Sequence, residues 1–242
     1  MVIILTFLGA ICFFISVMLI NQRTLRLTLE IITGVIFVLS TTLMTLNYSH
    51  HFGMEQVTTT KVQRIYSASN SPMPLALYQP VGKNGQDDVY IYNTKVKQKT
   101  PNHTQANEFT TSKIKWVNNA NPQMVTKETR WQYKNDFYKM LYAWSGMDGT
   151  LVKRTNTLEY PRTYVKITTK QADKLGKFAH STTGKQAQAQ AQQQGQAFVT
   201  SKVQAAMQKN PTMTAEQIQT VSKQAEEEFQ SQAVKQMLQQ LK

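Results

Sequence analysis

The chain has 242 residues, and its 27 Lys and Arg against 14 Asp and Glu give a formal net charge of +13. A single Cys, 10 Gly and 7 Pro exclude a disulfide scaffold, a collagen-like chain and a multi-cysteine zinc or iron–sulfur site. The apolar residues are concentrated at the N-terminal end, where we expect a membrane anchor.

Two apolar runs fill the first fifty residues. Residues 1–20 contain no charged side chain, and twenty helical residues span about 30 Å, the thickness of the hydrocarbon core of a bilayer. A second run, 27–47, follows a loop over 21–26 and carries one charge, Glu30. Because backbone amides in lipid must pair within helices or closed barrels, residues 1–49 are predicted to form an antiparallel transmembrane helical hairpin.

Basic residues beside these runs set the expected orientation. Arg23 and Arg26 lie in the short loop, whereas residues 48–60 hold no Lys or Arg. The positive-inside rule then places the loop in the cytoplasm and both the N-terminus and the large C-terminal portion outside the cell membrane. A cleaved signal peptide is disfavoured, because residues 1–20 lack a positive n-region and a second span follows. Glu30 is expected to pair with Arg26 one helical turn away.

Residues 50–170 are predicted to form an all-β extracytoplasmic domain, an antiparallel sandwich or barrel. Period-two alternation, typical of half-buried strands, occurs in four segments. Aliphatic and aromatic side chains alternate in residues 89–92, and apolar and polar side chains alternate in residues 113–117, 130–134 and 163–168. The Tyr and Trp residues between Tyr78 and Tyr164 are expected to build one core. This domain contains no Cys, which favours a Gram-positive bacterial envelope over an animal secreted protein.

Residues 171–242 are predicted to form a helical, Ala- and Gln-rich C-terminal segment. The stretch 185–196 is polar and of low complexity, and the Asn-Pro pair at 210–211 interrupts the helical pattern after it. Thr214 and Gln217 have the spacing of a capping box, so a second helix is expected to begin there. Its narrow apolar stripe needs a partner: the other helix, the β domain, a second copy of the chain or the membrane surface.

The sequence contains none of the common catalytic motifs. It has no Gly-x-Ser-x-Gly elbow, no phosphate-binding glycine loop and no His-Glu-x-x-His pair. Cys12 lies inside the first apolar run, and the acidic residues are scattered among basic neighbours. We therefore expect no enzymatic activity, no catalytic or metal-binding residues and no cofactor. An active site assembled from dispersed Tyr, Lys and Arg side chains is the enzymatic alternative.

The strongest positive signal is electrostatic. Lys95, Lys97 and Lys99 alternate along one predicted strand, so they would share a face. Lys113 and Lys115 do the same on the next strand, and the two runs could pair as a hairpin. Such a basic face outside a Gram-positive cell would attract teichoic acids, anionic headgroups or acidic polysaccharides. Alternatively, these lysines only keep exposed strands soluble. Nucleic acid is not an expected partner, because the charge faces away from the cytoplasm.

Several segments resemble a known group of sequences: Thr126–Lys139, Ser145–Gly149, Lys153–Thr157 and Thr168–Ala172. They resemble an uncharacterised domain-of-unknown-function family of two-span membrane proteins from lactic acid bacteria. The resemblance covers the whole chain, implies no activity and supports the Gram-positive interpretation. In architecture alone, the chain is also similar to subunit II of haem–copper oxidases. A copper centre of that type needs two Cys and two His, and the absence of Cys after the hairpin excludes it.

The sequence thus favours a non-catalytic membrane-anchored envelope protein, an accessory subunit or interaction module of a Gram-positive cell surface. One alternative is a module that binds anionic cell-wall polymer or lipid headgroups through its basic β face. A second is a copper-free protein similar to oxidase subunit II. The expected partners are membrane lipids, a membrane protein and an anionic cell-wall polymer.

Overall fold

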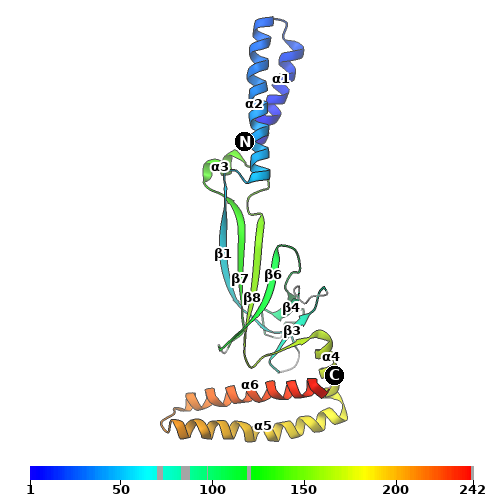
Figure 1. Cartoon of the computed structure of the whole chain (residues 1–242), viewed down its shortest axis with the longest axis vertical. Helices are drawn as coiled ribbons and strands as arrows, with labels where there is room; N and C mark the ends of the chain where they lie inside the picture. Colours follow the sequence, from blue (N-terminus) through cyan, green and yellow to red (C-terminus); the bar gives the residue numbers. More distant parts are fainter. Residues whose placement is uncertain (70–72, 83–87, 97, 119–120, 241–242) are drawn as a thin grey trace. The chain divides into compact units, whose positions relative to one another are not determined.

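The computed structural model, coloured along the sequence in Figure 1, describes residues 1–69, 73–82, 88–96, 98–118 and 121–240. The chain divides into two compact units. The first is made of residues 1–59 and 127–154, and the second of residues 60–126 and 155–242. Each unit therefore combines segments that are distant in the sequence.

Two apolar helices begin the first unit, α1 (Val2–Leu19) and α2 (Arg23–His50), and they lie side by side (Figure 1). Both are long and apolar enough to cross a membrane, which confirms the prediction of two apolar N-terminal helices. The connection between them is shorter than expected. Helix α2 already begins at Arg23, because Arg is a good helix former and the first-turn amides need no partner within the helix.

Small residues bring α1 and α2 together. The Thr6 hydroxyl donates to Met44 Sδ at 3.5 Å near one end of the pair. Further along, a Cβ added to Gly9 would lie 3.3 Å from backbone atoms of Phe37, so the helices approach closely at this glycine. A residue further along α1 contacts a residue nearer the start of α2: Thr6 contacts Met44, whereas Gly9 contacts Phe37. The two helices therefore run antiparallel.

A short helix, α3 (Asp136–Leu141), lies in the region that we expected to be all-β. The side chain of Asn135 caps it by accepting a hydrogen bond from the backbone N–H of Tyr138 at 3.1 Å. The rest of the first unit consists of parts of three strands whose other residues belong to the second unit.

The strands form two sheets. The first has the order β1-β7-β8-β6, with β1 (Met54–Arg64), β6 (Thr110–Val117), β7 (Gln123–Tyr133) and β8 (Leu151–Pro161). The second has the order β2-β4-β3-β9, with β5 paired to β4. Its strands are β2 (Tyr66–Ser67), β3 (Leu75–Gln79), β4 (Val89–Asn93), β5 (Asn102–His103) and β9 (Val165–Thr168).

All four segments predicted from alternation contain strand residues, in β4, β6, β7 and β9. The expectation of purely antiparallel strands is wrong in one place, because β3 and β9 pair in parallel, with Leu75 opposite Val165 and Leu77 opposite Ile167. Strand β9 follows β3 only after a long connection, and such a crossover permits parallel pairing where a tight hairpin does not.

Two clusters of buried side chains form the core of the second unit. One combines side chains from both sheets: Ile65, Ala76, Tyr90, Tyr92, Met124, Leu158 and Tyr160. The other joins the second sheet to the C-terminal helices, through Leu75, Leu77, Val165, Ile167, Leu175 and Val234. The apolar stripe of the last helix therefore has a partner within the chain, since Val234 packs against the sheet.

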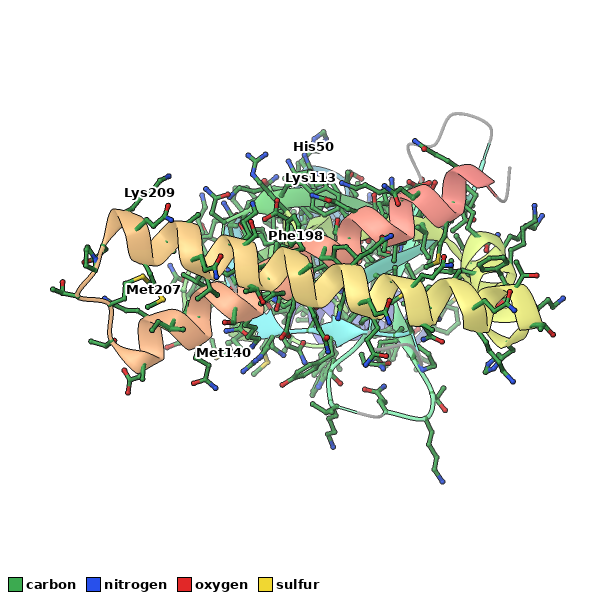
Figure 2. The ribbon with its side chains drawn as sticks, turned by 90° about the horizontal axis from the view of Figure 1, so that it is seen from below. His50, Lys113, Met140, Phe198, Met207 and Lys209 are labelled. Carbon is green, nitrogen blue, oxygen red and sulfur yellow. The ribbon has the colours of Figure 1, made fainter. Side chains whose placement is uncertain are left out.

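The second unit ends in three helices, α4 (Thr169–His180), α5 (Thr182–Lys209) and α6 (Ala215–Gln240). Figure 2 shows α5 and α6 side by side, with Met207 and Lys209 at the turn end of the hairpin. The predicted capping box is confirmed, because Thr214 N–H donates to Gln217 Oε1 at 2.9 Å and Gln217 N–H donates to Thr214 Oγ1 at 3.3 Å. Helix α4 has a second capping box that we had not predicted.

Candidate functional site

Two of the candidate anion-binding lysines lie on β6. Lys113 and Lys115 alternate along this strand, and both are exposed. The Lys115 ammonium is 2.9 Å from Glu159 Oε1, and Gln123 Nε2 donates to Glu159 Oε2 at 2.6 Å. These hydrogen bonds, from Gln123 first and Lys115 second, lower the pKa of the Glu159 carboxyl below its usual value. Part of the positive charge at Lys115 is therefore already balanced within the chain.

Lys95 and Lys99 are exposed, but they do not lie on a strand as predicted. Strand β4 ends at Asn93, and the chain then turns. The side-chain oxygen of Gln98 accepts hydrogen bonds from the backbone N–H groups of Thr94 and Lys95, at 3.0 and 3.3 Å, which favours the turn over an extended chain.

The two lysine runs also do not pair as a hairpin, because β4 and β6 belong to different sheets. Lys97 falls outside the described residues. The four described candidates therefore divide between a turn of the second sheet and a strand of the first.

Sequence reasoning missed an ion-pair cluster around Glu128. Arg154 Nε donates to Glu128 Oε1 at 2.7 Å, and Arg130 Nε donates to Glu128 Oε2 at 2.9 Å. Arg130 also donates to the carbonyl of Gly149 at 2.8 Å. Burial raises the pKa of the Glu128 carboxyl, but the two guanidinium groups outweigh burial and lower it overall. Both arginines contribute to the excess of basic residues, yet one carboxylate binds both.

A second unforeseen cluster surrounds Lys166 of β9. Its ammonium is 2.8 Å from Asp88 Oδ2, 4.2 Å from the centre of the Tyr78 ring and 5.5 Å from the centre of the Tyr90 ring. Burial lowers the pKa of this ammonium, but the hydrogen bond to Asp88 and the two tyrosines raise it more, so the net pKa is higher than usual. The cation–π contacts and the ion pair fix β9 beside β3 and β4.

Aromatic and polar side chains hold α3 and its loop against the C-terminal end of α2. His51 stacks on Trp131 with ring centroids 4.0 Å apart. The Tyr133 hydroxyl lies 2.7 Å from Ser145 Oγ and 3.5 Å from Oδ1 of Asn47, a buried residue of α2. The expectation of one aromatic core is thus wrong, because one aromatic group packs at the end of α2 and another belongs to the buried cluster with side chains from both sheets.

The two arginines that the sequence predicts to determine the topology lie at the other end of the hairpin. Arg23 and Arg26 lie in the first two turns of α2, and Arg26 Nε is 3.5 Å from Glu30 Oε1, as expected from the sequence. Within the described ranges, no group of three or more His, Cys, Asp or Glu side chains is placed to hold a metal ion.

These features define the chain as a protein with an apolar N-terminal helical hairpin, mixed β-sheets of about nine strands and a C-terminal helical hairpin. The model of the family described as Domain of unknown function (DUF4811) matches residues 22–175. The chain belongs to this family, which confirms the resemblance to a family of unknown function. Comparison with the curated proteins and with the solved structures found no match.

Proposed function

We propose that the chain is a non-catalytic, membrane-anchored envelope protein that serves as an accessory subunit or interaction module at a Gram-positive cell surface. One observation carries the proposal: α1 and α2 pack through small residues and turn their large apolar side chains outward. Phe7, Leu19 and Ile31 are between 66% and 72% exposed. The core helices of a soluble protein would bury such side chains, whereas a bilayer solvates them.

The proposed orientation places the α1–α2 turn in the cytoplasm. Arg23 and Arg26 at the start of α2 support it through the positive-inside rule. The residues after the hairpin then lie outside, and they hold +12 of the net charge, since the hairpin contains two Arg and one Glu. The buried cluster with side chains from both sheets supports a face-to-face sandwich in this extracytoplasmic part.

Anchoring and partnership are tested with the full chain in cells. We expect the protein to stay in the membrane fraction after an alkaline carbonate wash, and a mild-detergent pull-down to recover a membrane protein in stoichiometric amount. Release by carbonate would overturn the anchor, and recovery of the bait alone would overturn the accessory-subunit role. A cysteine introduced by Lys153→Cys in a Cys12→Ser background should react with an impermeant thiol reagent on intact cells, and failure to react would overturn the orientation.

Exposure of the lysines favours a second candidate function, the binding of an anionic cell-wall polymer or of lipid headgroups. The candidates are Lys95, Lys97, Lys99, Lys113 and Lys115, and the four within the described residues are all exposed. Because Lys115 is paired with Glu159, Lys113→Gln is expected to weaken binding more than Lys115→Gln.

Sedimentation of the purified full chain with anionic wall material at low and high salt tests this function. Replacing the five lysines by Gln should abolish the salt-sensitive binding. A matched control removes the same charge from exposed helical positions, namely Lys174, Lys177, Lys209, Lys223 and Lys235. Equal loss of binding in both variants would reduce the effect to net charge and remove the candidate site.

A further inference from the structure

Large apolar side chains are exposed at the end of the α1–α2 hairpin that lies opposite its turn. They come from the end of α2, from the turn after it, from α3 and from the loop after α3. Tyr48, Phe137 and Trp144 are 74%, 59% and 78% exposed, and Phe52 and Met140 are also exposed. We name these five residues the collar.

Contacts with the start of α1 and with the chain that follows α2 fix the collar in place, and Figure 1 shows α3 at this end of the hairpin. The amino nitrogen of Met1 donates to the carbonyl of Met140 at 3.3 Å, which holds α3 beside the start of α1. The rings of Phe52 and Tyr138 meet edge to face, with centroids 5.9 Å apart. Gly53 has a φ of +82°, and a Cβ there would collide with the Tyr138 ring, so the chain after α2 fits closely against α3.

Trp144 is held in a backbone conformation that is rare for a bulky residue. Its φ is +68°, in the left-handed region, where residues with a Cβ are destabilised by about 1–2 kcal/mol. A hydrogen bond from Ser145 N–H to the carbonyl of Tyr142, 3.1 Å long, closes the turn around it. A strained turn that directs a large amphipathic ring away from the protein indicates a role for that ring outside the core.

We propose that the collar is a lipid-binding surface that lies in the headgroup region of the bilayer. The proposal rests on the membrane anchoring proposed above. Helix α1 has 18 residues and is therefore about 27 Å long, close to the thickness of the hydrocarbon core. If α1 spans that core, Met1 lies at one boundary, and Met140 beside it lies at the same depth. Trp and Tyr side chains are enriched at this depth because their apolar rings carry a polar group.

The chemistry around the collar favours lipid over a protein partner. Lys134 lies just before α3, Lys139 lies within it, and both are exposed. Their ammonium groups can reach phosphate while their alkyl stems lie along apolar surface. Met1, itself exposed, connects the collar to the outward apolar side chains of the hairpin. One continuous surface thus changes from purely apolar to aromatic and basic, as the bilayer changes from hydrocarbon to headgroups.

The test measures the depth of Trp144 by fluorescence in the full chain, reconstituted in vesicles of phosphatidylcholine and phosphatidylglycerol. Trp116→Phe and Trp131→Phe leave Trp144 as the only tryptophan. The matched control adds Trp144→Phe and Lys127→Trp, which moves the reporter to an exposed position of β7 in the same unit. Position 127 is about 20 Å along the strand from Tyr133, whose hydroxyl reaches α2.

We expect lipids with a nitroxide near the headgroup to quench Trp144 severalfold more than lipids with a nitroxide near the chain end. Iodide should quench it severalfold less than the tryptophan introduced by Lys127→Trp. Quenching by iodide as strong as at position 127 would overturn the proposal. Protection from iodide without quenching by nitroxide lipids would also overturn it, because the collar would then be covered by protein.

A carbonate wash of the same vesicles separates the two proposals. If the protein remains in the membrane while Trp144 is in water, the proposed anchor is supported and the proposed lipid contact of the collar is overturned. If the wash releases the protein, both proposals are overturned. Because Trp131→Phe alters the stack on His51, a second measurement labels a single cysteine, from Trp144→Cys in a Cys12→Ser background, with a polarity-sensitive dye. Its emission should be blue-shifted relative to the same dye at Lys127→Cys, and equal emission would overturn the proposal.

Discussion

The chain contains two long helical hairpins, and they differ in the polarity of the side chains that they expose. In α1–α2 the exposed positions are mostly Phe, Leu, Ile, Val and Met. In α5–α6 the exposed positions are mostly Gln, Lys, Glu and Ala, and the Phe198 and Phe229 rings meet between the helices with centroids 5.7 Å apart. Helices α2 and α5 have the same length, 28 residues, so length does not distinguish the hairpins.

Similar devices bring the helices together in both hairpins. Gly9 allows α1 to approach the backbone of Phe37, and Gly195 allows α5 to approach the ring of Phe229. The source of stability differs, however. In water, burial of the Phe198–Phe229 seam stabilises the pair, whereas in lipid the tails are as apolar as the helix exterior and only close packing remains. The exterior, not the packing geometry, is therefore the observation that supports the proposed lipid environment of the first hairpin.

The largest expected effect comes from a charge placed on the exterior of the apolar hairpin. Ile11, near the middle of α1, is 54% exposed, and Ile11→Arg would place a guanidinium near the bilayer centre. We expect a penalty of about 2.5–3.5 kcal/mol for insertion. The carbonate-resistant fraction of the protein measures the loss.

Gln193→Arg is the matched control, since it places the same charge on the exposed face of α5. It should leave both membrane association and stability unchanged, within about 0.5 kcal/mol. If Ile11→Arg were equally silent, the first hairpin would lie in water, and the contrast between the two hairpins would disappear.

The next largest effect is expected where α1 packs closely against the backbone of α2, at Gly9. Gly9→Leu would force a side chain against the Phe37 backbone, and we expect the α1–α2 contact to weaken by about 1–3 kcal/mol. Disulfide cross-linking between Thr6→Cys and Met44→Cys, in a Cys12→Ser background, reports that contact. Cross-linking should fall severalfold relative to the same pair with Gly9 retained.

In the α5–α6 hairpin, replacing the glycine at the helix contact is expected to stabilise the structure rather than to weaken it. A Cβ at Gly195 would meet only the Phe229 ring at 3.1 Å, and a ring can turn aside. Gly195→Ala should therefore stabilise α5 by up to about 1 kcal/mol through helix propensity, seen as slower amide hydrogen exchange. Faster exchange in the Gly195→Ala variant would show that α5 and α6 pack as closely at Gly195 as α1 and α2 do at Gly9.

Helix capping should matter in water and not in the apolar hairpin. Thr214→Ala removes the hydroxyl that accepts a hydrogen bond from Gln217 N–H, whereas the bond from Thr214 N–H to Gln217 Oε1 can still form. We expect the first turn of α6 to lose about 1 kcal/mol. Gln22, the N-cap of α2, makes no side-chain capping bond, so Gln22→Ala should leave α2 unchanged. Hydrogen exchange at the two helix starts measures both effects, and equal effects would contradict the distinction.

Sequence patterns predicted the features that depend on neighbouring residues. The apolar helices follow from runs long enough to cross a bilayer, and the start of α6 follows from the Thr214–Gln217 spacing. The alternation at 163–168 likewise predicted that Val165 and Ile167 share a buried face of β9. In each case the physical cause lies within a few residues of the feature.

The sequence patterns did not predict features that depend on distant segments, on one side-chain hydrogen bond to the backbone or on a strained residue. The parallel pairing of β3 with β9 is stabilised by Lys166, Asp88 and Tyr78, which come from separate segments. The turn that begins after β4 depends on a side-chain oxygen of Gln98, which accepts from the backbone N–H groups of Thr94 and Lys95 and so opposes the alternating strand pattern. Exposure of Trp144 follows from a strained turn, so counting aromatic residues toward a core gave the wrong place for it.

The smallest expected effect concerns the single ion pair that each hairpin shows among the described residues. Lys202 of α5 and Glu228 of α6 are 3.0 Å apart and nearly half exposed, so water screens them, and Glu228→Gln should change stability by only about 0–1 kcal/mol.

Arg26 and Glu30 of α2 are 3.5 Å apart at the proposed cytoplasmic boundary, where Glu30→Gln leaves Arg26 without its neighbouring carboxylate. We expect Glu30→Gln to be similarly mild and to leave the orientation unchanged, because orientation depends on Lys and Arg rather than on net charge. Impermeant thiol labelling at Lys153→Cys measures orientation, and an inverted population in the Glu30→Gln variant would mean that the carboxylate, not the arginines, sets the topology.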